Sequence, residues 1–144
     1  MSSKMLFFGE YRKKLDSGRR LVIPANLLKS LGEEPMLVGY IKPGENCIRF
    51  YDKTSFEEMV EEVVRNADET TKTRLMRHFY VNSRNFELDI RRRIRISDKF
   101  CDSTGINSNV VIVGIGTRFE VWDEETYDKA MSVAKDDENL VAPF

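Results

Sequence analysis

One stretch of nine residues occurs twice in this chain. Residues 15–23 read LDSGRRLVI and residues 88–96 read LDIRRRIRI, so both copies share the frame Leu-Asp-x-x-x-Arg followed by a strand-like run. The same offset of 73 residues separates Gly32 from Gly105. A single unit of this size seldom buries its own apolar face, so we expect two halves packed about a pseudo-two-fold axis. That axis brings both arginine-bearing loops together.

The length and composition support one packed unit made of two halves. The 144 residues are 41% hydrophobic and 33% charged, which suffices for one core. We expect a first half with its following helix at 1–70 and a second half with its following helix at 71–135. The remaining residues, 136–144, are expected to form a flexible tail.

Several function classes are excluded by what the sequence lacks. No apolar stretch approaches the roughly 20 residues that span a bilayer, and the amino terminus lacks a signal peptide, so we predict a cytoplasmic protein without a membrane partner. Cys47, Cys101 and the single His78 have no metal-ligand or disulfide spacing. There is also no Gly-rich phosphate loop and no nucleophile–base pair. The sequence therefore predicts no enzyme, no cofactor and no small-molecule substrate.

The near-neutral net charge of −1 hides a strong segregation of sign. Residues 1–20 carry six basic and two acidic side chains, and residues 72–99 carry nine basic and three acidic ones. The compensating acid lies in residues 52–71 and 120–144, with seven and eight acidic side chains against two basic ones each. Positive charge thus follows the repeated loop, which favours a polyanionic partner over an ordinary solvated face.

The repeated loop is predicted to be a tight turn between two strands. Alternating or strand-like runs precede it at 11–15 and 83–88 and follow it at 20–23 and 93–96. The loop aspartates, Asp16 and Asp89, can accept backbone N–H bonds and so stabilise the turn. Gly18 in the first copy permits a positive φ angle there, and the second copy has no glycine at that position. After each loop we expect a short helix, a hairpin and a longer helix, with an additional basic helix linking the halves at 71–79.

Five ordered motifs make the chain similar to the MraZ family, which belongs with the AbrB-type, swapped-hairpin transcription factors. The motifs cover most of the chain, and they are FGEY at 8–11, Asp16 with Arg20, LVIP at 21–24, Asp89 with Arg93, and FEVWD at 119–123.

This resemblance implies a β-rich α+β fold, a double-split β-barrel built from two β-α-β-β halves. It also implies ring-like homo-oligomers that bind double-stranded DNA at repeated promoter sites of the division and cell-wall gene cluster, hence a nucleoid-associated protein. The family's DNA-contacting positions fall on Arg20, Arg93, Arg19, Arg92, Arg91, Lys14 and Arg12. Asp16, Asp89 and Gly18 are the positions expected to shape the loops.

The chemistry of these residue types fits that role. Arginine carries a permanent charge on a planar fork that matches a phosphate or the O6/N7 edge of guanine. The aspartates are expected to orient Arg20 and Arg93 rather than to touch anionic DNA. An exposed ion pair that only shaped the turn would contribute about 0 to 1 kcal/mol to stability, which is little for a motif that occurs in both repeats. An antitoxin-like or scaffold protein of the same fold, holding a protein partner through its acidic helices, is the alternative.

Overall fold

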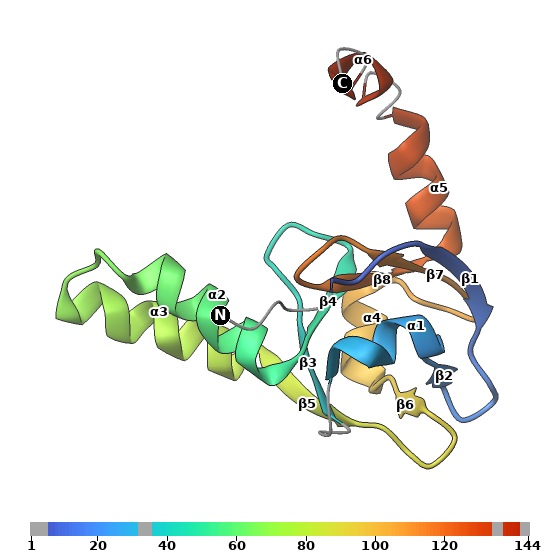
Figure 1. Cartoon of the computed structure of the whole chain (residues 1–144), viewed down its shortest axis with the longest axis horizontal. Coiled ribbons are helices and arrows are strands. Elements are labelled where there is room, and N and C mark those ends of the chain that lie inside the picture. The colour runs from blue at the N-terminus through green and yellow to red at the C-terminus, as the bar shows by residue number, and fades with distance from the viewer. Residues whose placement is uncertain (1–5, 32–35, 134–136, 142–144) are drawn as a thin grey trace.

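The computed structural model describes residues 6–31, 36–133 and 137–141. Figure 1 shows a central β-rich body from which two helical segments project. The first half contains β1 (Glu10–Lys14), β2 (Arg20–Val22), α1 (Ala25–Leu28), the 3-10 turn η1 (Lys29–Leu31), β3 (Met36–Tyr40), β4 (Cys47–Tyr51) and α2 (Lys53–Val64). After α3 (Glu69–Val81), the second half contains β5 (Ser83–Glu87), β6 (Arg93–Arg95), α4 (Asp98–Thr104), β7 (Asn109–Gly114), β8 (Phe119–Asp123) and α5 (Glu124–Val133), followed by α6 (Asp137–Val141).

The two halves contain the same elements in the same order, so the predicted mixed α+β fold of two repeated halves is confirmed. The short helix of the second half ends at Gly105, whose φ of 74° is the left-handed conformation expected of a glycine C-cap. Its counterpart Gly32 lies outside the described residues. Where the first half begins this helix after Pro24, the second uses Ser97, whose Oγ accepts a hydrogen bond from the Phe100 amide.

The halves exchange their first strands. The six-stranded antiparallel sheet has the order β1-β7-β8-β4-β3-β5, so β1 pairs with the second half and β5 pairs with the first. Reversing the order and interchanging the halves leaves it unchanged, as a pseudo-two-fold axis between β4 and β8 requires. Strands β2 and β6 form a separate two-stranded ribbon. Within the described residues β1 and β5 are the edges of the sheet, so the double-split barrel stays a prediction.

One main hydrophobic core joins the sheet to the ribbon. Leu21 of β2 and Ile94 of β6 pair with each other in the ribbon and are 0% and 1% exposed. Their neighbours along the strands point outward, because successive side chains of a strand alternate between its faces. The ribbon is therefore held to the body by its apolar face and leaves its arginine-bearing face exposed.

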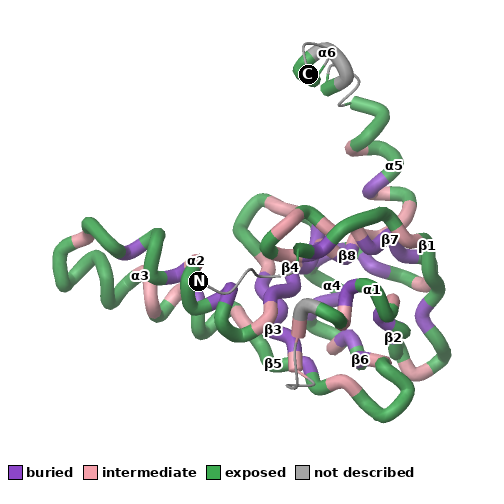
Figure 2. Tube along the Cα trace, viewed as in Figure 1, coloured by how far each residue is buried: buried purple, intermediate pink, exposed green. Residues whose placement is uncertain are grey.

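The helical hairpin of α2 and α3 covers a second apolar cluster on the other face of β3. Val38 and Tyr40 of this strand pack there, whereas Leu37 belongs to the main core. The hairpin then extends beyond the body, and Figure 2 shows its outer surface as largely exposed. Within 6–31, 36–133 and 137–141, none of the helices has the length and apolarity that a membrane span requires.

Candidate nucleic-acid interface

Both repeated loops emerge at the end of the body that lies opposite the α2–α3 hairpin (Figure 1). The first joins β1 to β2 and the second joins β5 to β6. The ribbon lies between them, because β2 and β6 pair antiparallel with Arg20 opposite Arg95 and Val22 opposite Arg93. We call the exposed face formed by residues 16–20, 89–93 and the outward side chains of β2 and β6 the double-loop surface.

A single aspartate organises the first loop. Asp16 Oδ1 accepts hydrogen bonds from the backbone amides of Gly18 at 2.9 Å and Arg20 at 2.8 Å. Its second carboxylate oxygen accepts from Arg20 Nε at 3.0 Å. The carbonyl of Asp16 also accepts from the Arg19 amide at 3.0 Å. The aspartate thus closes the turn and orients the arginine four residues later, as the sequence predicts.

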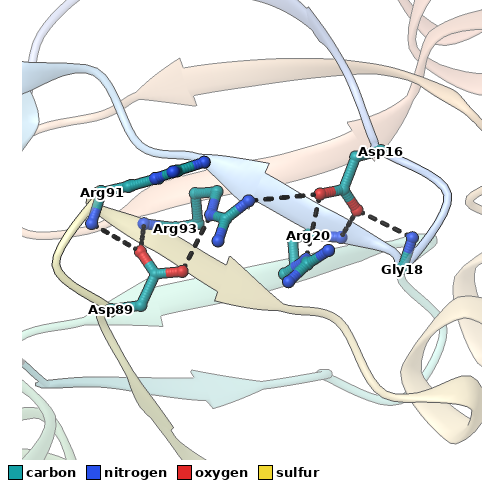
Figure 3. A network of polar contacts seen from close by, with 6 residues as sticks. All are labelled: Asp16, Gly18, Arg20, Asp89, Arg91 and Arg93. Atoms are coloured by element: carbon teal, nitrogen blue, oxygen red, sulfur yellow. Dashed lines mark hydrogen bonds and ion pairs between the residues drawn. The ribbon is translucent and has the colours of Figure 1, made fainter.

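The second loop repeats this geometry at the 73-residue offset. Asp89 Oδ1 accepts from the amides of Arg91 and Arg93, each at 2.9 Å, and Oδ2 accepts from Arg93 Nε at 2.8 Å (Figure 3). The second loop therefore adopts the same closed turn without a glycine.

The expectation that Gly18 takes the positive φ angle is wrong. The left-handed residues are Arg19, with a φ of 58°, and its equivalent Arg92, with a φ of 62°. This conformation is costly for a side chain with a Cβ. Gly18 instead allows close approach, because a Cβ there would lie 3.2 Å from the guanidinium atoms Nε and Nη2 of Arg20.

The two left-handed arginines attach each loop to the opposite half. The carbonyl of Arg19 accepts a hydrogen bond from the Ile96 amide, and the carbonyl of Arg92 accepts one from the Ile23 amide, both at 2.9 Å. Each left-handed residue thus directs its carbonyl to the opposite half. The sequence does not predict these two hydrogen bonds, since the partners lie about 70 residues apart in the chain and contribute only backbone groups.

The loop carboxylates are held in their charged form. Hydrogen bonding from the Arg20 amide is the largest cause that lowers the pKa of Asp16, and the Arg93 amide does the same for Asp89. Both carboxylates accept hydrogen bonds from their own loops, and the arginines are the groups presented to solvent. This agrees with the predicted loop-shaping role of the two aspartates.

The remaining loop arginines differ in their surroundings. Arg91 and Arg92 are exposed. Arg19 pairs with the carboxylate of Asp98, which also lies 3.8 Å from Arg95 Nη2. Sequence reasoning missed Asp98 and Arg95. Alternation along β6 could have placed Arg95 on the outward face of the ribbon, because Ile94 and Ile96 are both buried.

Lys14 and Arg12 occupy different positions from the box arginines. Lys14 is the exposed last residue of β1, directly before the first loop. The guanidinium of Arg12 lies against α5, where Nη2 donates to Asp128 Oδ1 at 2.9 Å and Nη1 lies 3.4 Å from Glu124 Oε2. The Asp128 hydrogen bond is the largest cause of the raised pKa of Arg12. Lys14 therefore lies two residues before Asp16, at the start of the first loop, whereas Arg12 lies in an ion-pair network with α5.

A group of possible metal ligands lies where the start of β4 pairs with β8. Glu45, Cys47 and Glu120 offer ligand atoms that are all within 4.8 Å of one another. However, Arg49 already donates to both oxygens of Glu45, at 2.8 and 2.7 Å, and Trp122 Nε1 donates to Glu120. Burial raises the pKa of the Cys47 thiol, which opposes the thiolate that metals require. These residues fit a neutralised ion-pair cluster rather than a cation site.

The fold and the double-loop surface together define a class of protein: an internally duplicated α+β protein with exchanged strands that presents two Asp-oriented arginine loops side by side. Comparison with known proteins narrows this class. A family model described as "MraZ protein, putative antitoxin-like" matches the chain twice, at residues 6–78 and 79–142. The chain belongs to the MraZ family.

Relatives align with nearly the whole chain. A protein named transcriptional regulator MraZ from Mycoplasma mobile is 35% identical over 135 residues, covering 92% of this chain and 90% of the relative. Proteins of the same name from Acetivibrio thermocellus and Mesoplasma florum are each 30% identical. They cover 95% and 86% of this chain and 92% and 84% of their own lengths.

Proposed function

We propose that this chain is a transcription regulator that binds specific promoter DNA through the double-loop surface. One observation carries the proposal: two aspartate-closed loops of the same backbone geometry are hydrogen-bonded to opposite halves, so their arginines share one exposed face. A rigid pair of cationic loops is suited to a regularly spaced polyanion. The names of the relatives in the family support regulation of transcription as the purpose of that binding.

The dimensions of DNA agree with a reader built from strands. The major groove is about 12 Å wide and admits a two-stranded ribbon. Arg20 and Arg93 lead into such a ribbon and would read base edges, while Arg19, Arg91, Arg92 and Lys14 would neutralise phosphates. Arg12 is proposed as a peripheral contact that has to leave its α5 carboxylates.

We further propose ring-like homo-oligomers that engage repeated promoter sites. Two projecting segments support association, because they carry large apolar side chains that the rest of the described chain leaves exposed. Val63 and Val81 on the α2–α3 hairpin are 49% and 69% exposed, and Val133 at the end of α5 is 86% exposed. Contacts between two different surfaces generate rings when the rotation closes.

The remaining parts of the proposal follow the family resemblance. The targets are the division and cell-wall gene cluster, and the protein acts in the cytoplasm at the nucleoid without a catalytic step. The halves are 1–70 and 71–135, and the six-stranded sheet and the ribbon together make the double-split barrel. Within the tail expected at 136–144, residues 137–141 form α6, and the others lie outside the described residues.

A selection of bound fragments from random double-stranded DNA, followed by footprinting on the chain's own promoter, tests the function. We expect one recurring motif and repeated protected sites. Affinity should fall with salt at a log–log slope of about −0.9 per neutralised phosphate. Recovery of no motif together with salt-insensitive binding would reject the proposal. Retention of a protein partner without DNA would favour the antitoxin-like or scaffold alternative.

A further inference from the structure

The two loops share one backbone geometry but differ in the side chains at their tips. Between the aspartate and the left-handed arginine, the first loop carries Ser17 and Gly18, whereas the second carries Ile90 and Arg91. Ile90 is 99% exposed, the highest value among the large hydrophobic residues that the structure describes. Asp89, directly before it, accepts hydrogen bonds from the amides of Arg91 and Arg93, which follow it, and these bonds fix the backbone around Ile90. The isoleucine is therefore held away from the core.

Folding gives no reason for an isoleucine at this position. A side chain that stays in water gains nothing from the hydrophobic effect, and the turn closes equally well around Ser17 in the first loop. The residue does have a use if the tip is buried against a binding partner.

The neighbouring charges define what that partner is. Arg91 and Arg92 directly follow Ile90 and are both exposed. The only carboxylate in the turn, Asp89, is already bound by backbone amides and by Arg93 Nε. An apolar protein pocket would have to accept this cationic rim, whereas DNA provides phosphates beside an apolar group. That apolar group is the C5-methyl of thymine, which lies in the major groove.

A second difference between the halves concerns the left-handed arginines. Arg19 is paired with Asp98 of the second half. At the 73-residue offset, the position equivalent to Asp98 is Ala25, which offers no carboxylate to Arg92. The second loop thus combines the apolar tip of Ile90 with Arg92, for which Ala25 cannot provide the equivalent of the Arg19–Asp98 ion pair. The pseudo-two-fold symmetry of the backbone is broken in the side chains that face the partner.

We propose that Ile90 is a specificity-determining residue that packs against the methyl group of a thymine while Arg91 and Arg92 hold the adjacent phosphates. In the first loop, Ser17 presents a hydroxyl at the position of Ile90, and Gly18 has no side chain at the position of Arg91. The two loops therefore read different bases. Each chain therefore recognises a non-palindromic site. This inference rests on the proposed function, because it assigns a base contact to the same double-loop surface.

Replacement of single thymines by 2′-deoxyuridine tests the inference, since this change removes only the methyl group. The DNA is the footprinted site, and affinity is measured by fluorescence anisotropy at one fixed salt concentration. We expect one thymine whose replacement weakens wild-type binding by about fourfold, the value for one buried methyl group. Ile90→Ser, which copies the first loop, should bind the thymine and uracil sites equally. Ser17→Ala serves as the matched control and should retain the fourfold preference.

The outcomes separate the inference from the function on which it rests. If wild-type protein binds every uracil-substituted site as tightly as the parent site, or if Ile90→Ser keeps the preference, the thymine contact is overturned while salt-dependent, motif-specific binding leaves the proposed function standing. If no motif-specific binding occurs, the proposed function fails, and the thymine contact fails with it. Thermal unfolding of Ile90→Ser at the wild-type temperature confirms that only the tip has changed.

Discussion

Asp16 of the first repeat lies 3.6 Å from Arg93 of the second, measured from Oδ2 to Nη1 (Figure 3). These residues are 77 positions apart in the chain, so the ion pair exists only when the two halves are packed together. The Arg93 side chain, which also binds Asp89, is 21% exposed, whereas the Arg20 side chain is 44% exposed. The two box arginines are thus equivalent in sequence but not in availability.

Truncation of either box arginine should weaken DNA binding while the fold is retained. One good bidentate base contact is worth about 1–3 kcal/mol, so we expect losses of roughly 5- to 150-fold for Arg20→Ala and Arg93→Ala. The loss should be larger for Arg20, because its guanidinium is the more exposed. Anisotropy titrations of the footprinted site measure the effect, with Arg65→Ala on the α2 end as a control. Wild-type affinity for both variants would contradict the assignment.

Removal of a loop aspartate should also weaken DNA binding, although it removes a negative charge from a DNA-binding surface. In Asp16→Ala the amides of Gly18 and Arg20 and the Nε of Arg20 lose their acceptor. Because ordering the loop on binding then costs free energy, we expect an affinity as low as that of Arg20→Ala. Faster amide exchange at residues 18 and 20 would accompany the loss. Tighter binding by Asp16→Ala would show that the aspartate acts only as a repulsive charge.

Acid should remove the contribution of the loop aspartates to folding. Their pKa values lie below the ordinary value of 3.8, so their stabilisation is present above that pH and disappears as pH falls through the lowered values. Urea unfolding should show wild type more stable than the Asp16→Asn, Asp89→Asn double variant at about pH 6, with the difference vanishing near pH 2. Glu125→Gln on α5 is the control. A difference that is independent of pH would mean that the carboxylate charge has no role in folding.

The ribbon should depend on its buried face for attachment to the body. Ile94→Ala truncates a side chain that is 1% exposed, and we expect the free energy of unfolding to fall by about 2–5 kcal/mol. Val22, on the outward face of the paired strand, is 43% exposed, so Val22→Ala should change stability by less than about 0.5 kcal/mol. Thermal unfolding followed by circular dichroism compares them. Equal effects would mean that the ribbon does not share the main core.

The repeat in the sequence was sufficient to predict both turns and the backbone hydrogen bonds that their aspartates accept. The Leu-Asp-x-x-x-Arg frame places an aspartate where it can accept amides two and four residues later, which is local information. The predicted convergence of the two loops is also observed, because a duplicated unit packs about an axis that brings equivalent segments together.

Apart from the family resemblance, the residue pattern does not predict the strand exchange, because the exchange is determined by contacts that no short segment encodes. Strand β1 is exposed at four of its five residues, so it has no apolar face that specifies a register or a partner. The left-handed conformation was assigned to Gly18 because glycine is its usual residue. The structure places it at Arg19, where the carbonyl has to meet the Ile96 amide of the other half.

Affinity should depend on the number and spacing of DNA sites. One chain presents one double-loop surface, and non-specific contacts of this kind have dissociation constants of about 10⁻⁴ to 10⁻⁶ M at physiological salt. When copies are joined in one assembly, binding of the second site becomes intramolecular and can raise avidity by roughly 10²- to 10⁴-fold. Titration of DNA with one, two or three correctly spaced motifs should therefore give steeply increasing affinity. Insertion of half a helical turn between motifs should abolish the gain, because it rotates the second site away from the next chain. If DNA with one motif and DNA with three motifs are bound with equal affinity, each double-loop surface acts alone, and the proposal that an oligomer binds repeated sites is wrong.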